Sequence, residues 1–232
     1  MTPAPNLQEI IDTIRRDAGS DNPLDQLATA ATTVNELSET SDAALGFFVD
    51  RARGAGHSWV EISAVLGVTK QAAHKRFAAA SATRPTLDRF TKRAQRVIAA
   101  ASGIALVHNH GYVGTEHLLL ALYAEPEAIA GKILLAHDIT AEAITAAVRE
   151  IVPDGDETHQ GEPPLTPRAS HVLQGAVEVA IDMGHNYVGT EHLLLALYRY
   201  PGGIAVRVLR DLGLEEDAAR DAVVEALRSL RS

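Results

Sequence analysis

The stretch Tyr112–Tyr123, YVGTEHLLLALY, recurs without a single change at Tyr187–Tyr198, an offset of 75 residues. The same offset, without a gap, aligns Phe90–Ala94 (FTKRA) with Leu165–Ala169 (LTPRA). Twelve consecutive identities do not arise by chance, and self-similarity at a fixed spacing indicates a duplicated structural unit. The sequence therefore contains two copies of one unit.

The two copies, residues 90–149 and 165–224, have the apolar spacing of α-helices. In the second copy, apolar side chains recur at three- and four-residue steps, as in Val172, Val179, Leu193, Leu194, Leu197, Val208, Leu209 and Val223. Thr115 and Thr190 stand just before the leucine-rich segments, where threonine is a good N-cap. No run of alternating strand residues occurs. We expect four helices per copy and an all-α fold.

Residues 58–78 have the pattern of a helix-turn-helix. A first helix ends at Gly67, which is free to take the positive φ of the turn, and Thr69 caps a second helix. Val68 is expected to fill the space between the two helices. The polar side chains near the start of the second helix are the candidate DNA contacts: Thr69, Lys70, Gln71, His74 and Lys75. Two alternatives remain open, a helical hairpin whose charges are solvated and a helix-turn-helix used for dimerisation or partner contact.

Three amphipathic stripes precede this motif, over residues 7–14, 24–34 and 44–49. The predicted organisation is a helical domain at 1–81, a linker at 82–86 and a double repeat at 87–232, with repeat one at 87–150, a polar linker at 151–164 and repeat two at 165–232.

The net charge of −9 hides one basic window. Residues 1–50 carry nine acidic and two basic side chains, and residues 86–232 carry twenty acidic and thirteen basic ones. Residues 51–84 carry one acidic and six basic side chains. The negative net charge disfavours a protein that coats nucleic acid without sequence preference. The basic window still allows the helix-turn-helix to contact DNA locally. Because the domain as a whole is acidic, we expect operator binding to need a dimer on a palindromic site.

Several function classes are disfavoured by the composition. The chain has no cysteine, which excludes disulfides, thiolate metal sites and cysteine nucleophiles. Neither a signal peptide nor an apolar span is evident, so we expect a soluble cytoplasmic protein without a membrane partner. A GxxxxGK[ST] phosphate loop is absent, since Ile133 follows Gly131-Lys132, and ATP-driven unfolding by these residues is not expected.

No catalytic, metal or cofactor site is expected either. The letters of a nuclease motif, His108-Asn109-His110, fall at a predicted helix end, outside the ββα context that this chemistry needs. The repeat-related histidines at 110, 117, 185 and 192 favour hydrogen-bonded structural roles. Glutamate and histidine are adjacent in Glu116-His117, and neighbours on a helix do not form the i, i+4 zinc pair.

The two GTEHLLLALY segments, each preceded by an FT-x-RA or LT-P-RA segment, resemble the double Clp repeat of the N-terminal domain of ClpC and ClpA unfoldases. The resemblance covers residues 86–232. Together with a helix-turn-helix, it is similar to the short ClpC-like proteins of actinobacteria that lack ATPase modules. It implies a pseudo-twofold pair of four-helix repeats that binds adaptors and substrates of a Clp protease.

The resemblance also implies binding residues. Phosphoarginine on marked substrates would be held in each repeat by a threonine and a glutamate, Thr91 with Glu116 and Thr166 with Glu191. A capping role explains the same four residues equally simply. Cyclic peptide antibiotics would occupy an apolar groove formed by Leu87, Phe90, Gln95, Ile98, Leu165, Ser170 and Gln174. Leu165 and Ser170 depart from the phenylalanine and lysine that the family often has there, which would change affinity.

Two hypotheses follow from these features. In the first, the chain is a non-catalytic binding protein that captures phosphoarginine-marked proteins, adaptors or cyclic peptides, as an accessory or decoy to the Clp protease and its components. In the second, it is a transcriptional regulator whose helix-turn-helix binds operator DNA and whose repeats sense a ligand. Autoregulation would join the two, with ligand in the repeats weakening operator binding.

Overall fold

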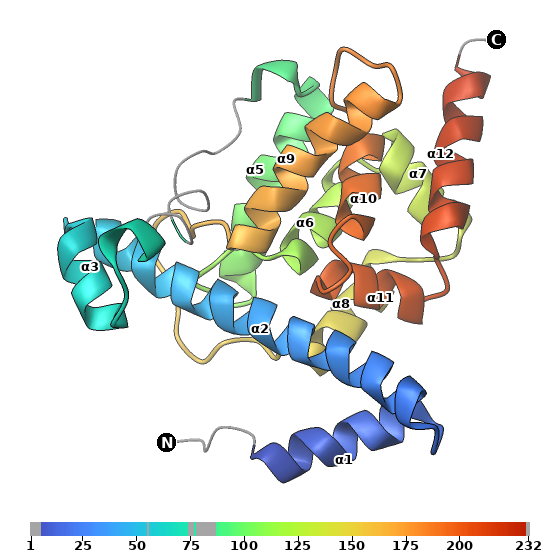
Figure 1. Cartoon of the computed structure of the whole chain (residues 1–232). Coiled ribbons are helices and arrows are strands. Elements are labelled where there is room, and N and C mark those ends of the chain that lie inside the picture. The colour runs from blue at the N-terminus through green and yellow to red at the C-terminus, as the bar shows by residue number, and fades with distance from the viewer. Residues whose placement is uncertain (1–5, 55, 74–76, 78–86, 231–232) are drawn as a thin grey trace. The chain divides into compact units, whose positions relative to one another are not determined.

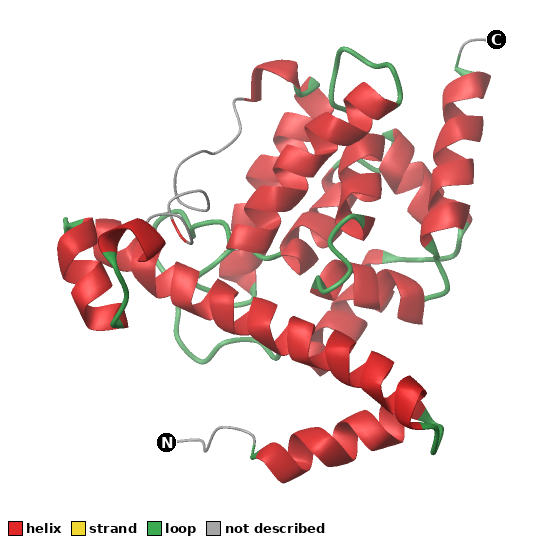
Figure 2. Ribbon diagram, viewed as in Figure 1, coloured by secondary structure: helices red, strands yellow, loops and turns green. Residues whose placement is uncertain are grey.

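The computed structural model describes residues 6–54, 56–73, 77 and 87–230. Helices account for the regular structure of these residues, and no strand is drawn among them (Figure 2). The all-α prediction is confirmed. The chain divides into two compact units, residues 1–45 and 46–232. The predicted linker at 82–86 lies outside the described residues.

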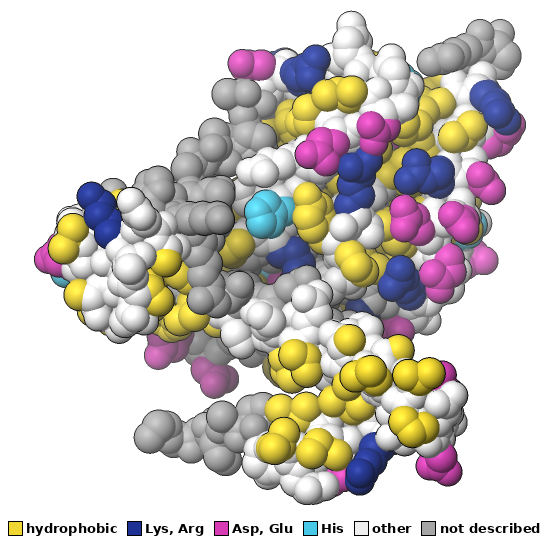
Figure 3. All heavy atoms as spheres, viewed as in Figure 1, with side chains coloured by type: hydrophobic (Ala, Val, Ile, Leu, Met, Phe, Trp, Pro, Cys, Tyr) yellow, Lys and Arg dark blue, Asp and Glu magenta, His cyan; other side chains and the backbone are white. Residues whose placement is uncertain are grey.

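The first unit contains α1 (Leu7–Ala18) and the first part of α2 (Pro23–Gly54). A capping box between Asn6 and Glu9 starts α1, and Gly19 in the left-handed conformation ends it. No side chain of α1 is buried, and hydrophobic side chains gather on the visible face of this hairpin (Figure 3). The sequence stripes at 24–34 and 44–49 both lie on the continuous α2.

Residues 58–73 have the local geometry predicted for the first helix and the turn of the candidate helix-turn-helix. A capping box between Ser58 and Glu61 starts α3 (Trp59–Leu66), and Gly67 ends it with a φ of 67°. Thr69 Oγ1 accepts a hydrogen bond from the Ala72 N–H at 3.1 Å, so Thr69 caps the second helix as expected. The buried core of this part consists of Val49, Ile62 and Phe77, with Ala52, Trp59 and Leu66 packed against it.

The expectation for Val68 is wrong. Its side chain is 41% exposed, and Ala73 and Phe77 of the second helix are buried instead. The space between the two helices is therefore closed by residues of the helices themselves.

Each repeat contains the predicted four α-helices. The first has α5 (Lys92–Val107), α6 (Thr115–Ala121), α7 (Ile129–Ala136) and α8 (Ala141–Ile151), with 3-10 turns η1 (Leu87–Arg89) and η2 (Leu122–Ala124). The second has α9 (Pro167–Asp182), α10 (Thr190–Tyr198), α11 (Ile204–Asp211) and α12 (Glu216–Ser229).

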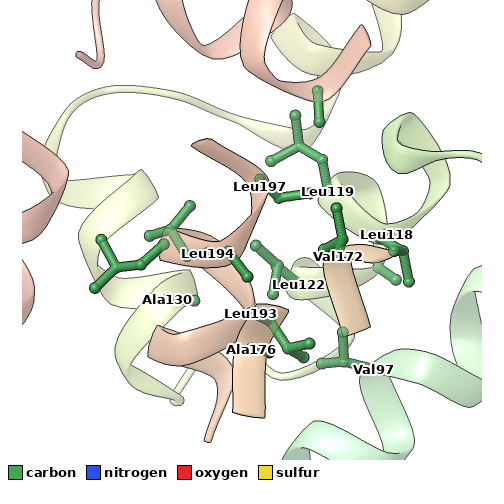
Figure 4. Packing of buried hydrophobic residues seen from close by; sticks show 14 of the residues in the cluster. Val97, Leu118, Leu119, Leu122, Ala130, Val172, Ala176, Leu193, Leu194 and Leu197 are labelled. Carbon is green, nitrogen blue, oxygen red and sulfur yellow. The ribbon is translucent and has the colours of Figure 1, made fainter. Parts of the chain in front are cut away.

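The two repeats interleave around one core (Figure 1). Helix α6 packs against α9 and α11 of the other repeat, and its counterpart α10 packs against α5 and α7. Likewise α8 contacts α11, and α12 contacts α7. Figure 4 shows leucines of α6 and α10, among them Leu119 and Leu194, meeting in the centre with Val97 and Val172 from α5 and α9. The packing therefore repeats the 75-residue symmetry of the sequence.

The segment between the repeats is attached to the end of α5. Asp154 accepts a hydrogen bond from Arg149 and lies 2.6 Å from His108 Nδ1, and the Gly155 N–H donates to the His108 carbonyl at 2.9 Å. The hydrogen bond from Arg149, then that from His108, lowers the pKa of Asp154 to about 2. His108 therefore has a structural partner. No helix among the described residues is both long and apolar enough to cross a membrane.

Candidate ligand-binding sites between the two repeats

Short backbone bridges join the start of each repeat to the other one. The Thr91 N–H donates to the Val188 carbonyl at 2.9 Å, and the Thr166 N–H donates to the Val113 carbonyl at 2.8 Å. Val188 lies three residues before Glu191, and Val113 lies three residues before Glu116. The backbone therefore brings the start of each repeat next to the loop that precedes the GTEH segment of the other repeat.

We therefore define two crossed sites. The first crossed site comprises Thr166, Arg168, Thr115 and Glu116, and the second comprises the residues 75 positions away, Thr91, Arg93, Thr190 and Glu191. Each contains the segment that starts one repeat and the GTEH segment of the other.

The two GTEH threonines cap helices of the opposite repeat. Thr115 Oγ1 accepts a hydrogen bond from the Ala205 N–H of α11, and Thr190 Oγ1 accepts one from the Ala130 N–H of α7, each at 3.3 Å. Both hydroxyls are buried, at 4% and 2% residue exposure. Since the first N–H groups of a helix have no partner within it, each threonine satisfies a donor that the other repeat leaves open. The GTEH threonine of each repeat therefore holds the start of a helix in the other repeat.

The two glutamates are buried against their own loops. Glu116 is 2% exposed and Glu191 is 3% exposed. A Cβ atom on Gly114 would lie 2.2 Å from Glu116 Oε1, and one on Gly189 would lie 2.3 Å from Glu191 Oε1. A side chain two residues before each glutamate would displace the carboxylate, because the carboxylate folds back over the backbone.

Glu116 is the more unusual of the two carboxyl groups. Its Oε1 atom is, among the described residues, the buried side-chain oxygen that lacks a hydrogen-bond partner. Burial raises its pKa to about 7, and a hydrogen bond from its own backbone N–H, the charge of Arg168 and a hydrogen bond from Thr115 act in the opposite direction. Burial also raises the pKa of Glu191. A buried acceptor without a donor is costly, so Glu116 is suited to a ligand that supplies one.

Histidine relays support both GTEH loops. His110 Nε2 lies 3.1 Å from the Pro153 carbonyl, which can only accept, so His110 Nδ1 accepts from His117 Nε2 at 2.8 Å. His117 Nδ1 then accepts from the Gly114 N–H at 2.8 Å. His185 and His192 repeat the 2.8 Å contact in the second copy. The predicted structural role of these four histidines is confirmed.

The predicted phosphoarginine threonines are helix caps. Thr91 Oγ1 accepts from the Ala94 N–H at 3.2 Å, and Thr166 Oγ1 accepts from the Ala169 N–H at 3.1 Å. Both side chains are half-buried at the N-termini of long helices. Capping leaves the hydroxyl proton available to an acceptor, so the cap does not prevent contact with a phosphate.

The predicted groove residues have different exposures. Leu87, Gln95, Ile98, Leu165 and Gln174 are half-buried, whereas Phe90 is 4% and Ser170 is 2% exposed. The Gln95 amide donates to the Leu87 and Phe90 carbonyls at 3.1 and 2.9 Å, so it braces the segment before α5. Most of the surface that a peptide could contact here belongs to the five half-buried side chains.

The helix-turn-helix candidates are partly described. Thr69, Lys70 and Gln71 are exposed at the start of the second helix. His74 and Lys75 lie outside the described residues. No cluster of three or more metal-ligating side chains occurs within the residues that the structure describes.

Arg168, Thr115 and Thr190 were not predicted as site residues. Arg168 belongs to the LTPRA segment, and a Cβ on Gly203 would lie 3.4 Å from its Cδ and 3.1 Å from Thr115 Oγ1. The recurrence of arginine at 93 and 168 was the signal in the sequence that could have identified it. The crossed caps of the two threonines gave no such signal, because they depend on contacts between residues 90 and 60 positions apart.

The sequence matches the Clp repeat (R) N-terminal domain family over residues 89–212 and 176–232. It is 45% identical over 141 residues to the ATP-dependent Clp protease ATP-binding subunit ClpC of Staphylococcus epidermidis, covering 61% of this chain and 17% of that protein. It is 38% identical over 231 residues to an uncharacterized protein of Mycobacterium tuberculosis, covering 97% and 88%.

Solved structures share the fold of the repeats. The N-terminal domain of ClpD from Arabidopsis thaliana superposes with a TM-score of 0.53 at 28% identity, over 62% of this chain and 98% of that one. The N-domain of ClpV from Vibrio cholerae gives a TM-score of 0.50 at 14% identity, over 58% and 82%, which shows the fold alone.

Proposed function

The chain belongs to the Clp repeat (R) N-terminal domain family, and we propose that it is a non-catalytic binding protein that captures ClpC-type ligands. These ligands are phosphoarginine-marked proteins and adaptors of the Clp protease. The single observation that carries the proposal is the first crossed site, where a buried carboxylate oxygen without a donor lies within the field of an arginine.

Phosphoarginine combines a guanidinium group with a phosphate, and the first crossed site has groups for both. A guanidinium needs a carboxylate acceptor, which Glu116 supplies. A phosphate needs cations and hydroxyl donors, which the Arg168 guanidinium and the Thr166 hydroxyl can supply. A ligand of this class would satisfy Glu116 Oε1 and offset the cost of its burial.

Binding without degradation would make the chain an accessory to, or a decoy for, the Clp protease. Cyclic peptide antibiotics are a further ligand class of the proposal, on the half-buried groove side chains Leu87, Ile98, Leu165 and Gln174. An apolar pocket at a repeat interface suits such a ligand. Titration with a ClpC-binding cyclic peptide tests this part, and Leu87→Ser with Leu165→Ser should weaken its binding.

Isothermal titration of the full chain with free phosphoarginine tests the main proposal. We expect binding by the natural chain and its loss in the double variant Glu116→Gln with Glu191→Gln. Glu142→Gln is the matched control, because Glu142 is an exposed glutamate at the same second position of its helix. Binding that persists in the double variant, or that is absent from the natural chain, would refute the proposal.

A second candidate function is DNA-binding transcriptional regulation. The observation that favours it is the turn at Gly67, followed by a Thr69-capped helix that exposes Lys70 and Gln71. Glutamine can pair bidentately with adenine, and lysine can reach guanine or phosphate. Ligand capture in the repeats would then weaken operator binding and raise expression of the protein.

A gel shift on the protein's own promoter region tests this candidate. Lys70→Ala and Gln71→Ala should each weaken binding, whereas Lys92→Ala, an exposed lysine at the start of α5, should not. Equal binding by all four proteins would count against the recognition helix. Adding phosphoarginine to the same assay tests whether ligand capture and DNA binding are coupled.

A further inference from the structure

The first compact unit exposes a row of apolar side chains along α2. Leu24, Leu27 and Val34 are 72%, 64% and 56% exposed, and Leu45 at the end of the unit is exposed as well. Among residues 6–45, no side chain that the structure describes is buried. Hydrophobic side chains are visible over this unit in Figure 3. A contiguous exposed apolar surface of this kind marks a contact with another molecule.

The exposed row follows a seven-residue period. We call it the α2 seam, and it consists of positions 24, 27, 31, 34, 38, 41 and 45, which alternate steps of three and four residues as the a and d positions of successive heptads do. Five of the seven residues are apolar, and the other two are Ser38 and Ser41. The Ser41 hydroxyl donates to the Leu37 carbonyl at 2.8 Å, so its burial would leave no unsatisfied donor.

The period of the α2 seam favours a second helix as its partner. A helix that packs on a globular surface has a wider apolar stripe with a period of 3.6 residues. A strict period of 3.5 residues instead keeps one narrow face turned toward another helix in a left-handed supercoil. Residues 24–45 span about 33 Å and about three heptads, which is long enough for a specific pair of helices.

The distribution of charge identifies that helix as α2 of a second copy. The first fifty residues carry nine acidic and two basic side chains, yet none of these occupies an a or d position of the α2 seam. Asp25, Glu36 and Glu39 stand at b and f positions, which are the outer positions of a helix pair. Asp42 stands at an e position, which in a parallel pair faces the g position of the partner, the uncharged Leu37. Two acidic copies can therefore meet along the seam without opposing like charges, whereas a basic partner would need acidic side chains on it.

We infer that two copies of this chain dimerise through the α2 seam, as a parallel pair of helices about a two-fold axis. In this arrangement each seam residue meets the same residue of the second copy, so apolar layers meet apolar layers and serines meet serines. An antiparallel pair of the same length would place apolar layers against serines. The inference concerns the first unit and holds whether or not the repeats bind phosphoarginine. It also supplies the dimer that operator binding is expected to need.

Sedimentation equilibrium of the full chain tests the inference. We expect a species of twice the mass of one chain. Leu27→Glu with Val34→Glu should raise the dimer dissociation constant by about 100-fold or more, because like charges would then face each other across the seam. Thr32→Glu is the matched control, since Thr32 is exposed on the same helix at a b position, and it should leave the dimer intact.

Far-UV circular dichroism of each variant checks that α2 stays helical, so that a loss of the dimer reports on the contact itself. A natural chain that is monomeric at every concentration tested would overturn the inference, because the seam would then be covered within one chain or by another protein. A dimer that the double variant leaves intact would also overturn it.

Cysteine cross-linking tests the position and direction of the contact. The natural chain has no cysteine, so Val34→Cys introduces a single thiol at a d position. In a parallel pair the two copies of this residue lie within the reach of a disulfide, and oxidised glutathione should give a covalent dimer on a non-reducing gel. Thr32→Cys should remain a single chain under the same conditions. Equal cross-linking of the two variants, or a dimer in solution that Val34→Cys does not cross-link, would contradict the parallel seam.

Discussion

Thr115 Oγ1 accepts a hydrogen bond from the Ala205 N–H, 90 residues away, at a distance of 3.3 Å. The contact places the loop before α6 on the first turn of α11, and the symmetry-related contact joins Thr190 to α7. Each repeat thus supplies a cap that the other needs. The two copies therefore depend on each other for stability, and neither is expected to be stable alone.

Removing one crossed hydroxyl should destabilise the whole repeat region. Thr115→Val keeps the shape of the side chain but leaves the buried Ala205 N–H without an acceptor, at a cost of about 1–3 kcal/mol. Urea unfolding of the full chain measures this difference. Thr145→Val is the control, because the Thr145 hydroxyl donates only to the carbonyl four residues earlier in its own helix. Equal stability of the two variants would show that the crossed cap contributes nothing.

Replacing the buried glutamate should stabilise the protein while it abolishes binding. The folded pKa of Glu116 is about 7, above its ordinary value of 4.5, so the folded state holds a proton that the unfolded state releases. Stability is therefore lost as pH rises from 4.5 to 7. Glu116→Gln removes this loss and should raise the free energy of unfolding at pH 8 on the order of 2 kcal/mol.

The comparison with Glu142→Gln makes this prediction specific. The pKa of the exposed Glu142 is lowered by its own backbone N–H and by Thr140, so its neutralisation should bring no gain at pH 8. The gain from Glu116→Gln should also shrink as pH falls from 7 to 4.5, because both states of the natural protein are protonated at this carboxyl below that window. A constant difference from pH 4 to 8 would contradict the assignment.

The histidine relays should give a stability slope of the opposite sign. Burial, then the charges of neighbouring histidines, lowers the pKa of His117 to about 3 and that of His192 to about 4. The unfolded state binds protons at these positions below pH 6.5, so stability is full above that value and lost as pH falls toward 4. Each histidine contributes about 1.4 kcal/mol per pH unit in this window.

The natural protein partly hides this slope, because Glu116 contributes the opposite one between pH 4.5 and 7. The slope should emerge in the Glu116→Gln background and flatten again when His117→Leu is added, although that variant is less stable overall. Unfolding free energies at half-unit pH intervals measure it. An unchanged slope on removal of His117 would show that the relay does not titrate with folding.

The duplication made the fold predictable from the sequence, but not the crossing of the sites. Apolar spacing and the GTEH caps indicated the helices of each copy, because these are local features within about one or two turns. The partner of Thr91 is Val188, 97 positions away, and nothing in local spacing specifies such a contact. Local spacing therefore could not identify which repeat supplies the backbone partner of Thr91.

The burial of several individual residues also could not be predicted from the sequence. Val68 was expected to fill the space between the two helices because it is apolar and follows the turn, yet it is 41% exposed, while Ala73 and Phe77 are buried. Phe90 and Ser170 were expected on a groove surface, and both are buried. Periodicity identifies the apolar face of a helix, but not which neighbour covers it. The histidine roles, by contrast, followed correctly from their recurrence with the repeat.

Two glycine-to-alanine substitutions should have opposite effects on stability. Gly67 has a φ of 67°, and nothing lies within 4 Å of its would-be Cβ, so Gly67→Ala introduces backbone strain without a clash. The cost should be about 1 kcal/mol, because a left-handed conformation is unfavourable for alanine. Gly103 is exposed within α5, where its would-be Cβ also meets nothing within 4 Å. Gly103→Ala should therefore stabilise the protein by about 0.5–1 kcal/mol through helix propensity and a less flexible unfolded chain.

The pair also distinguishes the two parts of the molecule. Because Gly67 ends α3, its replacement should loosen the helix-turn-helix and weaken any DNA binding, while phosphoarginine titration of the repeats stays unchanged. Gly103→Ala should raise the unfolding midpoint of the repeats and leave a gel shift unchanged. Amide exchange measured along the chain locates each effect. Strain at Gly67 that instead reduced phosphoarginine affinity would mean that the state of the turn is coupled to the crossed sites, as the autoregulation hypothesis requires.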